Sequence, residues 1–341
     1  MEKRVGDLGE FGLLDRLFTL VRRAEIPVGL GDDAAVLTVS PGRWLLVTTD
    51  TLVEEVHFRR AWASAWQVGY KALAVNLSDI AAMGGTPTYA LISLAVPGSL
   101  SLSWVEDLYR GLEACAAQWG VRIVGGDTVA AASICLTVVL LGECEAGRVR
   151  TRGDGRAGDL LLVTGELGAA GAGLEELSAP AAACPPAARA RVVARHLLPT
   201  PRLAEGRLLA AHPAVGAVID LSDGLAQGVR EIARASAVGA EIWSESLPLA
   251  LATKEVAAAH GQDPLAWALY GGEDYELLFS VRPSAVAAVR EELDRACGTP
   301  VRVIGCLLPP EAGLLVERAG ERVPLARGGY DHFLQPGKNY G

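Results

Sequence analysis

The chain has 341 residues, of which 50% are hydrophobic and 21% charged, and its formal net charge is −9. This length suits about two domains, and the apolar content suffices for packed cores. The negative charge argues against nucleic acid or an anionic membrane surface as a partner, and the chain shows no apolar run of the roughly 18–20 residues that a membrane span needs.

Hydrophobic periodicity predicts helices and strands that alternate in both halves of the chain, which indicates an α/β or α+β class. The pattern predicts, in order, a helix over 11–24, a strand over 43–53, a helix over 64–84, a strand over 88–97, a helix over 102–120, strands over 121–128, 133–145, 160–165 and 216–222, helices over 224–236 and 284–296, and a strand over 301–308.

A polar, glycine-rich stretch over 151–159 (TRGDGRAGD) is the best candidate for a domain boundary. After it, 166–177 is interpreted as the start of a helix, 178–188 is predicted as a loop, and 267–281 has no predicted type. The six cysteines form no C-x-x-C pair and no zinc spacing, and the first residues resemble no signal peptide. We therefore expect a cytoplasmic protein with reduced thiols.

Aspartates recur where predicted elements end. A lone aspartate is most simply a turn former or a helix cap, but several at strand ends point to a site, because α/β proteins build sites there. If they converge, each pair 4 Å apart repels by about 4 kcal/mol at an effective dielectric near 20, so cations or protons must neutralise them. The aspartates are Asp32, Asp33, Asp50, Asp79, Asp127, Asp220 and Asp223.

Oxygen ligands favour Mg²⁺, Mn²⁺ or Ca²⁺ over zinc or copper, and hard cations among carboxylates commonly serve phosphate chemistry. The segments GLGDD, VGGDT and YGGED place glycines beside acids, where backbone amides can approach a phosphate, although a plain turn explains each one alone equally well. P-loop, dinucleotide-binding, protein-kinase and nucleophile-elbow motifs are absent, so no covalent nucleophile is predicted.

His57 (in TLVEEVHF) is the one histidine near an acid-rich segment, although a core or hydrogen-bonding histidine is the commoner case. The tripeptide Leu-Ser-Asp occurs twice, at 77–79 in a predicted helix and at 221–223 after a predicted strand. We interpret the copies as two segments that bring one ligand type to one cluster. Asp79 is then predicted to lie within metal-bridging distance of Asp220, although about 140 residues, one domain length, separate them.

Eight separated blocks follow one another along the chain: GDDAAVL, TTDTLVEEVHF, YKALAVNLSDIAAMGGTP, GGDT, TRGDGRAGD, DLSDGL, GGEDYEL and GYDHF. In their order and approximate spacing, the chain resembles the thiamine-monophosphate kinase family, from GEFGLL at 9–14 to GYDHF at 329–333.

The resemblance implies ATP-dependent phosphorylation of thiamine monophosphate to thiamine diphosphate, by direct in-line transfer assisted by several Mg²⁺ ions. It implies the two-domain fold of the aminoimidazole ribonucleotide synthetase-like superfamily. An N-terminal α/β domain over 1–149 would bind ATP and Mg²⁺ and pair its sheet across a homodimer, and a C-terminal α/β domain would cover 150–341. The attacking phosphate is already ionised, so positioning and charge neutralisation suffice.

The resemblance also implies three groups of site residues. The metal ligands would be Asp33, Thr48, Thr49, Asp50, Asp79, Asp127, Asp220 and Asp223, with the two threonines contributing a hydroxyl or backbone oxygen. The residues in contact with ATP would be Tyr109, Gly126, Asp127, Arg152 and Ser222, with Arg152 as a cationic fork for phosphate. The residues in contact with thiamine monophosphate would be His57, Glu273 and Tyr330.

Other functions remain as alternatives. Selenophosphate synthetase would carry an early reactive cysteine, but the first cysteine here, Cys115, falls in a predicted helix. The related hydrogenase-maturation enzyme would end in a reactive cysteine, where this chain reads QPGKNYG. A non-catalytic paralogue would have lost some of the acids, and a calcium-binding structural protein would carry a D-x-D-x-D-G loop.

Overall fold

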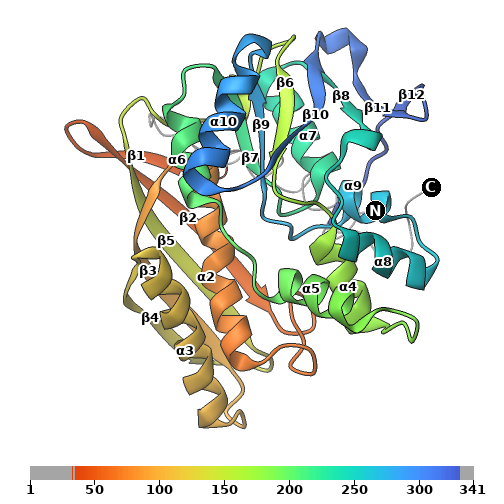
Figure 1. Ribbon diagram of the computed structural model, residues 1–341. Coiled ribbons are helices and arrows are strands. Elements are labelled where there is room, and N and C mark those ends of the chain that lie inside the picture. Colours follow the sequence, from red (N-terminus) through yellow and green to blue (C-terminus); the bar gives the residue numbers. More distant parts are fainter. Residues whose placement is uncertain (1–32, 34, 331–341) are drawn as a thin grey trace, which may run out of the picture.

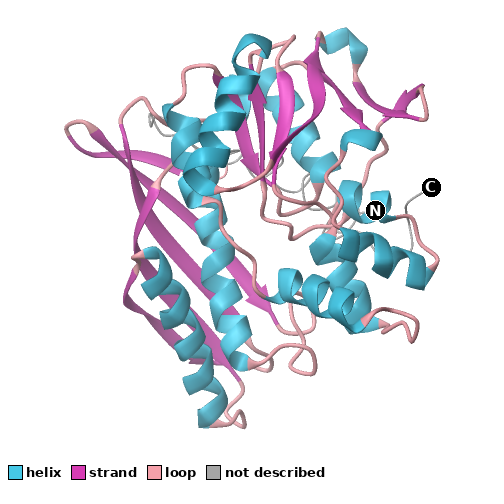
Figure 2. Cartoon of the chain, viewed as in Figure 1, coloured by secondary structure: helices cyan, strands magenta, loops and turns pink. Residues whose placement is uncertain are grey.

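The structure is a computed structural model that describes residue 33 and residues 35–330. The predicted helix over 11–24 lies outside this part of the chain. Two β-sheets lie beside each other, with helices packed on and between them (Figures 1 and 2). Among the described residues, no helix has the length and apolar character needed to cross a membrane.

The first half of the chain forms a five-stranded sheet with two helices on one face. Its elements are β1 (Ala35–Ser40), β2 (Arg43–Val53), α2 (Ala65–Ala82), β3 (Thr86–Val96), α3 (Leu102–Trp119), β4 (Arg122–Ala130) and β5 (Cys135–Glu145). The strand order is β1-β2-β5-β3-β4, and only the β3–β4 pair is parallel. Alternate residues of β2, such as Leu46, Thr48 and Leu52, are buried, as expected for a strand with one covered face.

Local sequence explains where both helices begin and end. The Ser64 side chain accepts a hydrogen bond from the Gln67 backbone N–H, and the Gln67 side chain accepts one from the Ser64 N–H, which together form a capping box at the start of α2. Helix α3 ends at Gly120, whose φ of 73° lies in the left-handed region. The helices pack closely, because a Cβ on Gly111 of α3 would lie only 1.9 Å from the carbonyl oxygen of Trp66.

The opposite face of this sheet carries exposed apolar side chains. Tyr89 and Leu91 of β3 are 38% and 40% exposed, and Val129 of the edge strand β4 is 49% exposed. The register pairs Leu91 with Gly125 and Ala95 with Val129, so the three side chains share one face. We call this surface, defined by Tyr89, Leu91 and Val129, the open face.

The second half of the chain forms a seven-stranded mixed sheet. Its elements are η2 (Arg152–Asp154), β6 (Leu160–Thr164), α4 (Ala169–Ser178), α5 (Pro186–Leu197), α6 (Leu203–Ala211), β7 (Val215–Asp220), α7 (Leu225–Ser236), β8 (Gly239–Trp243), η3 (Ser244–Ser246), α8 (Leu251–His260), α9 (Pro264–Tyr270), β9 (Leu277–Val281), η4 (Pro283–Ala285), α10 (Val286–Cys297), β10 (Val301–Leu308), η5 (Pro310–Ala312), β11 (Leu314–Arg318) and β12 (Glu321–Pro324). The strand order is β12-β11-β8-β10-β6-β9-β7.

The two-domain α/β prediction is confirmed, and the predicted strands and helices within the described residues are present with small shifts at their ends. The predicted loop over 178–188 is wrong at its end, because α5 begins at Pro186, a residue that suits the first turn of a helix. Helices α6, α8 and α9 and strands β1, β8, β9, β11 and β12 were not predicted. The domain boundary near 150 stays a prediction.

Helix α2 lies between the two sheets (Figure 1) and packs against β2 and β5 on one side and against β7 and α6 on the other. One hydrophobic core cluster accordingly extends from Leu46 and Leu77 in the first half to Leu162 and Phe279 in the second. The two halves therefore share a core along α2, which fixes the side chains that this helix presents to both.

We expect Gly111→Ala to lower the free energy of unfolding by about 1–3 kcal/mol, because the added Cβ meets backbone that has no room to yield. Denaturant titration measures the change. The matched control is Gly98→Ala, since a Cβ there meets nothing within 4 Å. Equal stability of the two variants would contradict the close packing of α2 on α3.

Candidate functional site

Three aspartates from distant parts of the chain meet between the two sheets. Asp33 precedes β1, Asp79 lies in the last turn of α2, and Asp220 ends β7. One carboxylate oxygen from each lies within 4.8 Å of the others. The predicted proximity of Asp79 and Asp220 is therefore confirmed. An all-oxygen donor set of this kind suits a hard divalent cation.

Hydroxyl groups and one arginine hold these carboxylates. The Ser78 hydroxyl donates to Asp220 Oδ2 at 2.7 Å, and the Thr48 hydroxyl donates to Asp79 Oδ2. Arg152 donates to both oxygens of Asp33, from Nη2 at 2.8 Å and from Nε at 3.1 Å. The predicted phosphate ligand Arg152 thus lies at the cluster, where its guanidinium partly balances the negative charge.

The acids raise one another's pKa values. Burial raises the pKa of Asp79 well above its ordinary value, and the charges of Asp50, Asp220 and Asp33 raise it further. Burial is also the main cause that raises the pKa of Asp220, followed by the charge of Asp33. Burial raises the pKa of Asp50 to about 6, although a hydrogen bond with Asp79 opposes the shift. Burial and neighbouring charge thus disfavour the ionised forms of Asp79 and Asp220 in the absence of a compensating positive charge.

Four predicted site residues lie away from this cluster. The Thr49 hydroxyl donates to the Val138 carbonyl at 3.0 Å and does not face Asp79, although its neighbour Thr48 does. The other three are in β4 and α3. Asp127 is exposed on the open face and pairs with Ser93 in the register. A Cβ added at Gly126 would lie 1.8 Å from the Ile92 carbonyl oxygen. Tyr109 packs against the hydrophobic core.

His57 lines a narrow pocket beside the cluster. Its Nδ1 accepts a hydrogen bond from the Val53 N–H at 3.0 Å, which orients the ring. The pocket joins both halves of the chain, since its walls come from the segment after β2, from α2 and from α5. Its polar and aromatic lining residues include His57, Arg59, Trp62, Gln67, Lys71 and His196.

The GGEDYE segment, residues 271–276, connects α9 to β9 along the edge of the site. Glu273 and Tyr275 have φ values of 68° and 49°, which are rare for residues other than glycine. Their N–H groups donate to the carbonyl oxygens of Ser222 and Leu221 at 2.6 and 2.9 Å. The segment thus holds the DLSDG turn that follows β7, and with it Asp220.

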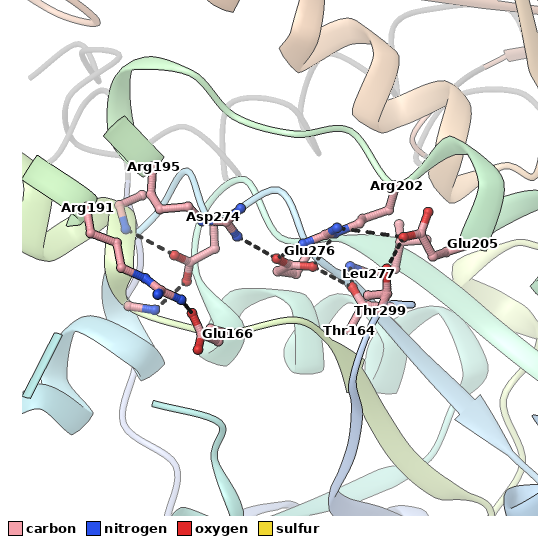
Figure 3. Close-up of polar contacts among 12 residues, drawn as sticks. Thr164, Glu166, Arg191, Arg195, Arg202, Glu205, Asp274, Glu276, Leu277 and Thr299 are labelled. Atoms are coloured by element: carbon pink, nitrogen blue, oxygen red, sulfur yellow. Dashed lines mark hydrogen bonds and ion pairs between the residues drawn. The ribbon is translucent and has the colours of Figure 1, made fainter. Parts of the chain in front are cut away.

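Glu276 anchors this segment through hydrogen bonds to two arginines and a threonine. Its side chain is fully buried and accepts hydrogen bonds from Arg195 and twice from Arg202, each at 2.6 Å, and from the Thr164 hydroxyl at 2.7 Å. Figure 3 shows these contacts as a chain that continues from Arg202 to Glu205. A buried carboxylate with this many partners is well compensated.

The two other acids of the segment reach different elements. Asp274 accepts hydrogen bonds from the N–H groups of Gly168 and Ala170 at the start of α4, at 2.7 and 3.3 Å, and burial raises its pKa to about 7. Glu273 lies 2.7 Å from Lys71 Nζ and 3.0 Å from His196 Nδ1. The predicted substrate residue Glu273 is thus ion-paired with α2 and next to the pocket.

The remaining predicted residues lie at the DLSDG turn. The Ser222 carbonyl accepts from Glu273 as described, and the Asp223 carbonyl accepts a hydrogen bond from the Tyr330 N–H at 3.3 Å. The Tyr330 side chain is 43% exposed. These contacts bring Ser222, Asp223, Glu273 and Tyr330 to one side of the acid cluster.

Sequence reasoning missed Lys71, Ser78, His196 and Tyr275. Burial and then the charges of Glu273, Asp50, Asp220 and Asp223 raise the pKa of Tyr275 well above its ordinary value. A lysine inside the apolar run YKALAV was a usable signal for Lys71. His196 had none, because its helix was not predicted.

Two family models match the chain. "AIR synthase related protein, N-terminal domain" covers residues 31–144, and "AIR synthase related protein, C-terminal domain" covers residues 156–311. Together they include the acid cluster and the pocket.

Named relatives match over nearly the whole chain. The thiamine-monophosphate kinase of Bacillus subtilis is 36% identical over 96% of this chain and 100% of its own length. That of Synechococcus elongatus is 37% identical over 97% of this chain and 98% of its own. The solved structure of AaThiL complexed with AMPPCP and TMP has a TM-score of 0.85 at 35% identity and covers 97% of this chain and 99% of that chain.

We expect Glu276→Gln to lower the free energy of unfolding by about 3–5 kcal/mol, because it leaves the half-buried Arg195 without its carboxylate partner and Arg202 with Glu205 alone. The control is Glu143→Gln, whose exposed ion pair with Arg43 contributes less than about 1 kcal/mol. Denaturant titration of both variants tests this. A loss for Glu276→Gln no larger than the control's would mean that the segment is not anchored here.

Proposed function

Because the chain belongs to the thiamine-monophosphate kinase family, we propose that it transfers the terminal phosphoryl group of ATP to thiamine monophosphate and forms thiamine diphosphate. The relatives' names and the complex of AaThiL with AMPPCP and TMP, which aligns over 97% of this chain, support both substrates. The observation that carries the proposal is the convergence of Asp33, Asp79 and Asp220 between the sheets.

The carboxylate set fits Mg²⁺. The three acids offer hard oxygen donors, and the raised pKa values of Asp79 and Asp220 support the presence of a positive charge among them. Bound Mg²⁺ would neutralise the charge that develops on the transferring phosphoryl group. We propose Asp33, Asp79 and Asp220 as its primary ligands, with Asp50 completing the set.

The chain's own groups bind and orient the substrates. The phosphate of thiamine monophosphate is already an ionised nucleophile, so no general base has to take its proton. Arg152, now on Asp33, is positioned to offer its planar fork to a phosphate of ATP. The DLSDG turn, fixed by the GGEDYE segment, holds Asp220 and Asp223 for an in-line transfer.

We also propose that the chain forms a homodimer through its open face. Tyr89, Leu91 and Val129 leave apolar area on a sheet whose edge strand β4 is unpaired on one side within the described residues. Contiguous exposed apolar surface of this kind marks an interface, and an edge strand needs cover. Asp127, which lies on this face, would then be at or near the interface.

The first test is the reaction itself. With Mg²⁺, ATP and thiamine monophosphate, we expect the purified protein to form thiamine diphosphate, detected by chromatography, and to stop when a chelator removes the metal. ATP left unspent with no new product would overturn the assignment.

We expect Asp220→Asn to lower kcat by roughly 100-fold or more, since it removes a charge aimed at the reacting phosphate. Its melting temperature should stay near that of the wild type, because the variant also relieves repulsion. Steady-state kinetics and thermal denaturation measure the two effects, with Asp294→Asn on the exposed side of α10 as the control. Unchanged kcat would place Asp220 outside the reaction.

We expect Leu91→Asp to convert the dimer to a monomer, because it places a charge in the centre of an apolar contact. Light scattering after size-exclusion chromatography gives the mass. The control is Leu102→Asp, at an exposed position on the helical side of the same sheet. A monomeric mass for the wild-type protein at micromolar concentration would contradict the proposed homodimer.

A further inference from the structure

Lys71 is a buried cation inside an apolar helix. Its side chain is 3% exposed, and its Nζ lies 2.7 Å from Glu273 Oε1. An ammonium group carries three N–H donors, yet Nζ has no well-aligned hydrogen bond to any described residue. A buried charge with unused donors is costly unless something else occupies them.

Lys71 lines the narrow pocket that His57 also lines. Next to Lys71, on the other oxygen of the same Glu273 carboxylate, His196 is 5% exposed, and its Nδ1 likewise has no aligned hydrogen bond among the described residues. The Arg59 guanidinium stacks over the Trp62 ring, 4.4 Å from its centre. The pocket lining thus combines the buried polar groups of Lys71 and His196 with the aromatic ring of Trp62.

Glu273 is the ion-pair partner of Lys71 in this pocket. Burial alone would raise the pKa of Glu273, but its contacts with Lys71 and His196 lower that pKa well below its ordinary value. The carboxylate is therefore ionised and already shared by two partners. It is a poor candidate to meet a second anion, while Lys71 and His196 still have capacity to do so.

Helix α2 connects Lys71 in the pocket to the acid cluster. Lys71 and Ser78 lie seven residues apart on one face of α2, so their backbones are about 10 Å apart. Ser78 holds Asp220, and Glu273 holds the turn beyond Asp220. A phosphate bound at Lys71 would therefore lie at the border of the acid cluster, where a phosphoryl group is to be received.

We propose that Lys71 recognises the phosphate of the acceptor, with Glu273 acting as the positioning residue that holds the ammonium group in place. This inference rests on the proposed function for the identity of the acceptor. A phosphate dianion matches the N–H donors of Lys71 in chemistry, and the aromatic rings of the acceptor match the Trp62 ring in the same pocket lining. Lys71 then distinguishes a phosphorylated acceptor from the same compound without phosphate.

The test compares two ligands by isothermal titration calorimetry with saturating Mg²⁺ and AMPPCP. Wild-type protein should bind thiamine monophosphate more tightly than thiamine. Lys71→Met should raise the Kd for thiamine monophosphate roughly ten- to hundredfold, the range expected for a lost charged hydrogen bond, and leave the Kd for thiamine unchanged. The matched control is Lys254→Met, the same change at an exposed lysine of α8.

If Lys71→Met fails to fold because Glu273 is left unpaired, the double variant Lys71→Met/Glu273→Gln removes both charges, and its preference for the phosphorylated ligand should be lost in the same way. A foldable variant that keeps the wild-type preference overturns the inference and leaves the proposed function intact. Wild-type protein that binds neither compound overturns the proposed function and, with it, this inference.

Discussion

The mutual repulsion of buried carboxylates is the constraint on which the site depends. Asp33, Asp79 and Asp220 come from a loop, a helix and a strand, and no short peptide could hold them together against about 4 kcal/mol per pair at 4 Å. The chain overcomes this repulsion with a shared core, since α2 packs against both sheets and carries Asp79 to the end of β7. Fold stability thus supports an arrangement of carboxylates that is locally unfavourable without a compensating positive charge.

The GGEDYE segment shows how such an arrangement is kept. Each of its three acids binds a different part of the fold, through Lys71 of α2, the start of α4, and the arginines of α5 and the following loop. The left-handed backbone at Glu273 and Tyr275 is costly, and these anchors maintain it. Glu273, which the resemblance implies as a substrate ligand, is thus also part of the framework of the site.

The fold could be predicted where the apolar residues of a single helix or strand alone show its type and its buried side, as in β2, α2, β3 and α3. Helix α5 was missed because prolines precede an arginine- and alanine-rich stretch whose apolar face is short. The sequence indicated Asp79 and Asp220 by residue type. It could not show that Thr48 faces the cluster while Thr49 faces away, nor that Lys71 pairs with a glutamate about 200 residues further along, since both follow from tertiary packing.

The continuity of α2 has a consequence for selectivity. Lys71 at the pocket and Ser78 at the acid cluster belong to one unbroken helix, so the separation between them is set by the rise of the backbone and by no hinge or loop. An acceptor held at Lys71, as proposed, would therefore keep a fixed distance from Asp220, which Ser78 holds, and the length of the acceptor would have to match that distance.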